Sequence, residues 1–255
     1  MFIDTHCHLY DECYGGDAKK VIETAKEHNV KKFFCVAENV ETSKKVSKIA
    51  SENQEVYAII GIHPEYANLF SDEQIEQLRQ ITKEKKVVGI GEIGLDYHYT
   101  KENKQKQIEM FEKQIELAGE LNLPIIIHTR DAIGDTMEIL QKNKDKLKRG
   151  GIIHCFHESK EVMDMAISLG FYIAYGGTIT FKNANSLREI VQKTPLDRIL
   201  TETDCPFLAP EPFRGTVNEP KNIDVIIQKM AEIKGVEVSE LEQIIEQNTK
   251  RLFGI

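Results

Sequence analysis

Short apolar runs alternate with longer amphipathic segments along the whole chain of 255 residues. Eight of these runs have the length and composition of β-strands, and the segments between them have the spacing of apolar positions that is typical of helices. The strand-like runs cover residues 2–9, 31–37, 56–64, 86–96, 124–130, 150–156, 171–180 and 198–206. Most of them are continuously apolar, which is typical of parallel strands buried on both faces.

The number and size of these units favour one architecture. Eight βα units in about 250 residues match the α/β class and a (β/α)8 barrel, or TIM barrel, which places active sites at the C-terminal ends of its strands. No linker of low complexity divides the sequence, so we expect one domain over residues 1–255. An open doubly wound sheet is the alternative, but no GxGxxG motif follows the first run, which argues against a dinucleotide-binding fold.

Local signals mark several helix starts. Ser71 with Gln74 and Ser239 with Glu242 have the spacing of a capping box, in which two side chains bond to the first backbone amides of a helix. Pro220 follows Asn218 and Glu219 and predicts another helix start, since proline suits the first turn.

Composition limits the classes of function. Hydrophobic residues make up 41% and charged residues 29% of the chain, as in a globular protein. The net charge of −8 argues against a protein that coats nucleic acid by bulk charge. The five cysteines lack CxxC spacing, and no apolar run approaches a membrane span. We therefore expect reduced thiols and a cytoplasmic protein without a signal peptide or a membrane partner.

Histidines and carboxylates fall near the ends of the predicted strands. His6 and His8 lie on one face of the first strand, because side chains alternate between the two faces. A single histidine at a strand end is more often a solvated or hydrogen-bonded residue than a ligand. In a barrel, however, all these strand ends open on one face. The residues expected to converge there are His6, His8, Glu92, His128, His154 and Asp204.

This ligand set exceeds what one four-coordinate zinc needs. Four imidazoles and two carboxylates suit two divalent ions that are bridged by a carboxylate and leave positions open for water and substrate. Glu92 lies between the two pairs of histidines in strand order and is the expected bridge. Imidazoles favour zinc or manganese over magnesium, so the identity of the two ions stays open.

Seven segments together resemble the TatD-type metal-dependent deoxyribonucleases, a family of amidohydrolase-like barrels. The resemblance runs along the whole chain through "DTHCHL" (4–9), "GIHP" (61–64), "GEIGLDYH" (91–98), "PIIIHTRDA" (124–132), "GGIIHCF" (150–156), "TETDCPFLAP" (201–210) and "RGTVNEP" (214–220). It implies the same six metal ligands, and it suggests that magnesium also supports activity. Related phosphotriesterase-like barrels usually carry a carboxylated lysine where this chain has Glu92, which favours the nuclease branch.

The expected activity is hydrolysis of phosphodiester bonds in DNA, or RNA, by a metal-activated water. Asp204 is the expected proton acceptor, and Glu92 is the bridge. His63, Arg130 and Arg214 are candidates to contact phosphates, although a turn residue and solvated surface charges are the ordinary alternatives. Release of mononucleotides from single-stranded ends is expected, in line with the resemblance and a mouth built of loops.

Two other functions remain open from the sequence. One is a two-metal barrel hydrolase of a smaller ester, an amide or an aminoacyl-tRNA bond, since some related proteins act on mischarged tRNA. The other is a metal-binding scaffold without activity, which the completely filled ligand set disfavours. The sequence indicates no obligate protein partner.

Overall fold

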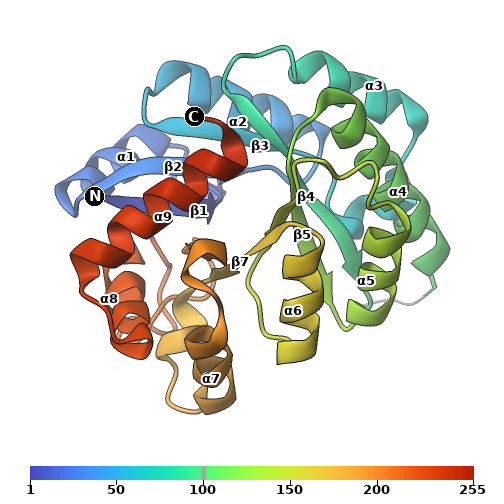
Figure 1. Cartoon of the computed structure of the whole chain (residues 1–255). Coiled ribbons are helices and arrows are strands. Elements are labelled where there is room, and N and C mark those ends of the chain that lie inside the picture. The colour runs from blue at the N-terminus through green and yellow to red at the C-terminus, as the bar shows by residue number, and fades with distance from the viewer. Residues whose placement is uncertain (99–101) are drawn as a thin grey trace.

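The computed structural model describes residues 1–98 and 102–255. Eight parallel strands form one sheet in sequential order, and each pairs with the next along the chain. Figure 1 shows this sheet curving around a central axis inside a ring of helices. The expected (β/α)8 barrel is confirmed. The strands are β1 (Phe2–Cys7), β2 (Val30–Val36), β3 (Val56–Ile60), β4 (Val87–Asp96), β5 (Ile125–Arg130), β6 (Gly151–Ile153), β7 (Phe171–Tyr175) and β8 (Ile199–Thr201).

Helices follow the strands and cover the outside of the barrel (Figure 1). The α-helices are α1 (Ala18–Glu27), α2 (Val40–Glu52), α3 (Asp72–Ile81), α4 (Lys104–Leu121), α5 (Ile133–Lys142), α6 (Lys160–Ser168), α7 (Asn185–Lys193), α8 (Ile223–Lys234) and α9 (Val238–Phe253). Short 3-10 helices are η1 (Glu12–Tyr14), η2 (Pro64–Leu69), η3 (Gly177–Thr180), η4 (Leu196–Arg198) and η5 (Pro220–Asn222). None of the helices in the described ranges is long and apolar enough to cross a membrane.

Several strands end earlier than their apolar runs predict. The runs expected to reach residues 64, 156, 180 and 206 leave the sheet after Ile60, Ile153, Tyr175 and Thr201. Beyond these points the chain forms segments whose residues stay buried, such as Ile62, Phe156 and Ile179. Burial therefore explains why the sequence stays apolar beyond the ends of these strands.

One of the two predicted capping boxes is confirmed. Ser71 and the side chain of Gln74 cap the start of α3. At the last helix the prediction was wrong, because α9 begins at Val238 with Glu237 in the capping position. Glu242 instead pairs with the terminal ammonium of Met1 at 2.7 Å.

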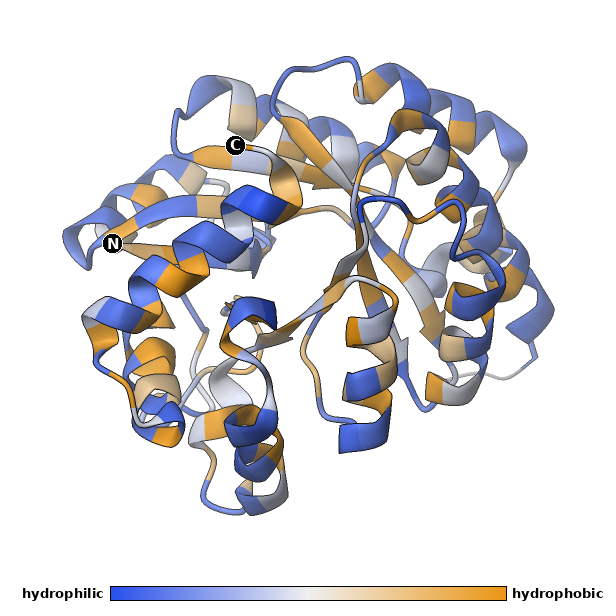
Figure 2. Cartoon of the chain, viewed as in Figure 1, coloured by the Kyte–Doolittle hydropathy of each residue, from blue (hydrophilic) through white to orange (hydrophobic). Residues whose placement is uncertain are grey.

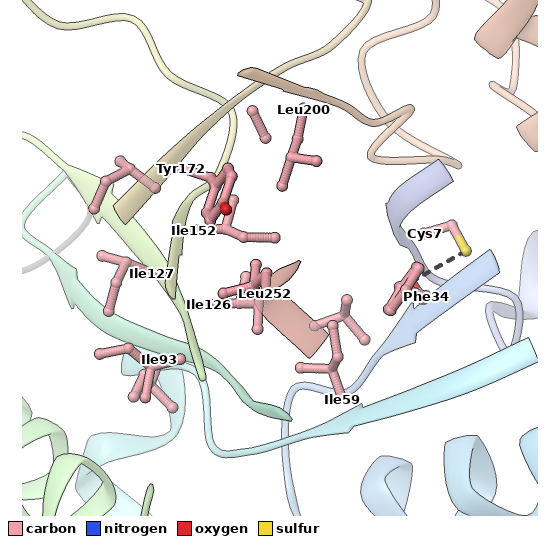
Figure 3. Packing of buried hydrophobic residues seen from close by; sticks show 14 of the residues in the cluster. Cys7, Phe34, Ile59, Ile93, Ile126, Ile127, Ile152, Tyr172, Leu200 and Leu252 are labelled. Carbon is pink, nitrogen blue, oxygen red and sulfur yellow. Dashed lines mark hydrogen bonds between the residues drawn. The ribbon is translucent and has the colours of Figure 1, made fainter. Parts of the chain in front are cut away.

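The core lies both inside the barrel and between the strands and the helices. Figure 2 shows apolar residues on the strands and on the inward faces of the helices, with polar residues outside. Figure 3 shows buried aliphatic side chains such as Ile59, Ile126 and Ile152, which are at most 1% exposed. This packed interior leaves the mouth at the C-terminal strand ends as the place for polar chemistry.

Side-chain hydrogen bonds help to close the barrel between β8 and β1. The Thr5 hydroxyl donates to the Thr201 carbonyl at 2.9 Å, and the Thr201 hydroxyl donates to the Ile3 carbonyl at 3.1 Å. Closer to the mouth, the Asp204 amide donates to the His6 carbonyl at 2.9 Å. The seam therefore holds the loop after β8 against the end of β1.

Candidate metal centre

The six predicted ligands meet at the mouth of the barrel. They come from β1, β4 and β5 and from the segments directly after β1, β6 and β8. Five are nearly inaccessible to solvent, with exposed fractions of 0% for His6 and 9% for Asp204 at the two extremes. The His128 side chain is slightly more open, at 17%. Residues that lie up to 198 positions apart thus form one buried polar cluster.

Glu92 lies at the middle of this cluster, on a strand whose ten residues are all buried. Its Oε2 atom lies 3.2 Å from Nε2 of His6. Its Oε1 atom lies 2.8 Å from Nδ1 of His128 and 2.9 Å from Nε2 of His154. The two oxygens of one carboxylate therefore face two different sets of imidazoles, as a bridging ligand requires.

Asp204 and the histidines of β1 form one side of the cluster. Oδ1 of Asp204 lies 3.6 Å from Nε2 of His6 and 3.5 Å from Nε2 of His8. The two Nε2 atoms are 3.3 Å apart. Asp204 has a φ of 55°, in the left-handed region, and this turn of the backbone follows directly from the end of the short β8.

The charges of the cluster are strongly coupled. Burial opposes ionisation of Glu92, but the imidazoles of His154 and His6 outweigh it and hold the pKa of this carboxyl well below its usual range. Burial likewise disfavours a charged His8, yet the hydrogen bond and charge of Asp204 raise its pKa to about 10. The carboxylates therefore stay ionised and demand positive charge at the mouth, which a divalent cation supplies when it replaces the imidazole protons.

The donor atoms fit a metal ion by their chemistry and spacing. In the described part of the chain, three groups of side chains have ligand atoms within 4.8 Å of one another: His6, His8 and Glu92; His63, Glu92 and His128; and His6, His154 and Glu202. Imidazole nitrogen and carboxylate oxygen together suit zinc and manganese. Nδ1 of His6 is also buried without a hydrogen-bond partner among the described residues, so a polar atom at this site is left unpaired.

His63 was predicted to contact substrate, and the structure places it beside the proposed metal ligands Glu92 and His128. Its Nε2 atom is 3.8 Å from Oε1 of Glu92, and its ring lies edge-on to that of His128 at 4.4 Å between centroids. Nδ1 accepts a hydrogen bond from the Glu65 amide at 3.3 Å and so caps η2. Burial lowers the pKa of His63 to about 3, which keeps the imidazole neutral and able to act as a ligand.

Two buried carboxylates beside the histidines were missed in the sequence. Oδ2 of Asp96 lies 2.9 Å from Nε2 of His128, and Oε1 of Glu202 lies 3.6 Å from Nδ1 of His154. Carboxylates placed against the second nitrogen of an imidazole orient the ring for a metal. Asp96 lies in the "GEIGLDYH" segment and Glu202 in the "TETDCPFLAP" segment. The signal in the sequence is a second carboxylate in each segment, which can pair with the second ring nitrogen of a buried histidine.

The two arginines lie on loops and strand ends around the cluster. Arg130 is exposed at the end of β5, two residues beyond His128. Burial raises the pKa of Asp96, but the hydrogen bond with His128, together with smaller contributions that include the charge of Arg130, outweighs it and lowers the pKa below its usual value. The guanidinium of Arg214 lies over the ring of Phe181 at 4.4 Å from its centroid. Neither guanidinium belongs to the groups of ligand atoms found among the described residues.

Comparison with known proteins agrees with this geometry. The model of the TatD related DNase family matches residues 3–254. The chain is 44% identical over 255 residues to the uncharacterized metal-dependent hydrolase YabD of Bacillus subtilis, with full coverage of both chains. It is 40% identical over 259 residues to the uncharacterized metal-dependent hydrolase YcfH of Escherichia coli K12, covering 100% of this chain and 96% of that one.

A solved structure has the same fold. The crystal structure of YjjV, a TatD homologue from Escherichia coli K12, superposes with a TM-score of 0.94 at 32% identity and covers 100% of this chain and 98% of that one. The match extends over the strands and loops that carry the buried histidines and carboxylates. The chain therefore belongs to the TatD family of metal-dependent hydrolases.

Proposed function

We propose that this protein is a deoxyribonuclease that uses two divalent metal ions to release nucleotides from single-stranded DNA ends. The observation that carries the proposal is the position of Glu92, whose two oxygens face separate sets of imidazoles at 2.8–3.2 Å. Membership of a family described as TatD related DNase supports a phosphodiester as the bond that is cleaved.

The side chains divide into two ligand sets that share Glu92. His6, His8 and Asp204 complete one set, and His128 and His154 complete the other, with His63 beside it. Zinc, manganese or magnesium, when bound, lowers the pKa of a coordinated water and offsets negative charge on the phosphoryl oxygens. Asp204 is the least buried carboxylate of the six ligands, so it is placed to orient an incoming water and to accept its proton.

The surroundings of the centre favour a strand end as substrate. The net charge of −8 provides no general attraction for a long polyanion. Arg130 and Arg214 are the cations proposed to hold the phosphates next to the scissile one, through the paired N–H groups of each guanidinium. Recognition of so few phosphates suits a frayed end better than an internal position on a duplex.

A time course on end-labelled DNA and RNA tests this proposal. Single- and double-stranded forms are incubated with Mg²⁺, Mn²⁺ or Zn²⁺, alongside a closed circular single strand. We expect mononucleotides from linear single-stranded DNA, slower loss of duplex and little cleavage of the circle. The Glu92→Ala variant should lose nearly all turnover while keeping its fold.

Counter-substrates separate this activity from other hydrolases. A lactone, a phosphotriester and an aminoacyl-tRNA are assayed under the same metal conditions. Faster turnover of any of these than of DNA would refute the nuclease assignment, as would rapid cutting of the circular strand for the exonucleolytic mode.

A further inference from the structure

The loop between β8 and η5 exposes four large apolar side chains, and one of them, Phe207, contacts a proposed metal ligand. Phe207 is 50%, Leu208 39%, Phe213 42% and Val217 52% exposed. In the described part of the chain only Leu69 and Met165 are other large hydrophobic side chains with comparable exposure. Four of the six large exposed hydrophobic side chains of the described residues thus belong to one loop, a concentration typical of a binding surface.

Phe207 is the member of this group that lies closest to the proposed ligands. Its ring centroid is 5.9 Å from that of His8, at an interplanar angle of 68°. His8 is 3% exposed and Phe207 is 50% exposed, so the phenyl ring is a solvent-accessible face in contact with a buried proposed ligand. An exposed aromatic face therefore lies beside the proposed metal site.

Hydrogen bonds hold Phe207 in its exposed position. The buried Asn218 side chain donates through Nδ2 to the Phe207 carbonyl at 2.7 Å and to the Thr203 carbonyl at 2.9 Å. The Phe207 amide donates to the carbonyl of Asp204 at 2.9 Å. The backbone of Phe207 is thus fixed by the same short segment that places a proposed ligand.

The other side of the loop is held just as closely. A Cβ atom on Gly177 would lie 2.2 Å from the Leu208 carbonyl oxygen, so the backbone of η3 and the loop are in direct contact. The Glu211 amide donates to the Thr180 hydroxyl at 2.8 Å. The exposed ring is therefore part of an ordered surface.

The same loop carries a fixed positive charge. Arg214 lies over the ring of Phe181 at 4.4 Å, a cation–π contact that limits the positions of its guanidinium. An exposed aromatic ring followed by a fixed cation matches a single nucleic-acid strand, whose flat bases alternate with phosphates. A second apolar protein surface would not use this charge.

We infer that Phe207 is a stacking platform for the nucleobase next to the scissile phosphate, which rests on the proposed nuclease function. All four bases have a π-face, so stacking of this kind tolerates any sequence. Phe207 is then a positioning residue that places the terminal nucleotide without reading it. The contribution of Phe207 to kcat/KM and to binding then depends on the presence of a base and not on the phosphodiester bond itself.

An abasic substrate separates these two dependences. We compare a short oligo-dT strand with the same strand in which a tetrahydrofuran abasic residue replaces the nucleotide released first. Base stacking on an aromatic side chain typically contributes enough that its loss weakens the interaction about 5- to 150-fold. We expect Phe207→Ala to lower kcat/KM by this factor on the normal strand and to leave the abasic strand nearly unchanged.

Matched variants define the cause of the loss. Phe207→Trp should retain the preference for a base, because it keeps an aromatic face. Met165→Ala removes another large exposed side chain, on the outer helix α6, and should change neither substrate. An equal loss on both strands in Phe207→Ala would overturn the inference, since it would mean that the ring acts only on the metal centre through His8.

Binding without hydrolysis distinguishes this inference from the proposed function. Fluorescence anisotropy with labelled normal and abasic strands is measured in EDTA, where no turnover occurs. If DNA is not hydrolysed under any metal, the nuclease proposal fails, while base-dependent binding that Phe207→Ala removes still supports the platform. Binding that ignores the base, or a wild-type dimer that Phe207→Ala converts to a monomer, overturns the platform.

Discussion

Replacing Glu92 should affect two metal ions, whereas replacing Asp204 should affect one. Glu92 faces His6 through Oε2 and both His128 and His154 through Oε1. Among the described residues, the ion pairs of the Asp204 carboxylate are with His6 and His8. The variants Glu92→Gln and Asp204→Asn keep the volume of each side chain and remove its negative charge, so they compare the two positions directly.

The size of the effect follows from the number of ligands lost. Four-ligand zinc sites bind with about 10–16 kcal/mol, or roughly 3 kcal/mol for each ligand. A loss of this size weakens metal affinity by about 100-fold or more. Glu92→Gln should weaken both ions by such a factor, whereas Asp204→Asn should weaken only the ion beside His6 and His8.

Metal content after dialysis and calorimetric titration measures these effects. We expect two ions per chain in the wild type, close to one in Asp204→Asn and close to none in Glu92→Gln. Asp131→Asn is the matched control, because Asp131 is also an acidic residue at the mouth with a left-handed φ of 54°, and its side chain is 62% exposed and pairs with His98. Circular dichroism verifies the fold of each variant.

Two results would refute this assignment of Glu92 and Asp204 to the two metal ions. Retention of two ions and near-normal turnover by Glu92→Gln would show that this carboxylate is no bridge. Identical metal loss in Glu92→Gln and Asp204→Asn would show that the two ligand sets are not separate.

Three further predictions follow from the structure around the centre. Gly94 has a φ of 140°, and a Cβ atom there would lie 2.0 Å from the carbonyl oxygen of His128. Gly94→Ala should therefore lower the free energy of unfolding in urea by about 2–4 kcal/mol. Gly134→Ala is the control, because a Cβ atom at this position in α5 meets open space and should not destabilise the fold. Asn218→Ala should lower the free energy of unfolding by about 2–4 kcal/mol in the same measurement, because the carbonyls of Thr203 and Phe207 lose their donor. An unchanged stability would contradict the role of these two hydrogen bonds. The log of affinity for single-stranded DNA should fall with the log of salt at a slope of about −0.7 to −2, and the Arg130→Ala, Arg214→Ala double variant should flatten it by about 1 to 1.5; a slope steeper than about −4 would indicate an extended basic surface.

Much of the candidate site is predictable from the order of the strands. A parallel barrel brings all C-terminal strand ends to one face, so histidines that follow "PIII" and "GGII" must approach each other there. Glu92 was expected at the centre because β4 lies between β1 and β5 in this order, and its contacts have that arrangement. The prediction needed topology only, without any knowledge of side-chain rotamers.

Contacts that depend on rotamers and loop paths were not predictable. Asp96 lies four residues beyond Glu92 on one strand, but only the orientation of the His128 ring shows that it faces Nε2. The position of His63 depends on the turn into η2, where its Nδ1 atom accepts a hydrogen bond from the Glu65 amide. The backbone position of Phe207 depends on the path of the loop, in which Asn218, eleven positions away, donates to its carbonyl.

The alternation of eight strands with helices is encoded in the order of residues along the chain, and with it the face on which the buried histidines and carboxylates meet. Periodicity and burial act over short segments, so they can be read along the chain. Which oxygen of Glu92 faces which imidazole, and which loop residues border the mouth, is set in the folded state alone. These choices depend on atoms brought together from opposite ends of the chain, as in the 3.5 Å approach of His8 and Asp204, because side-chain geometry is set by the packing of all neighbours at once.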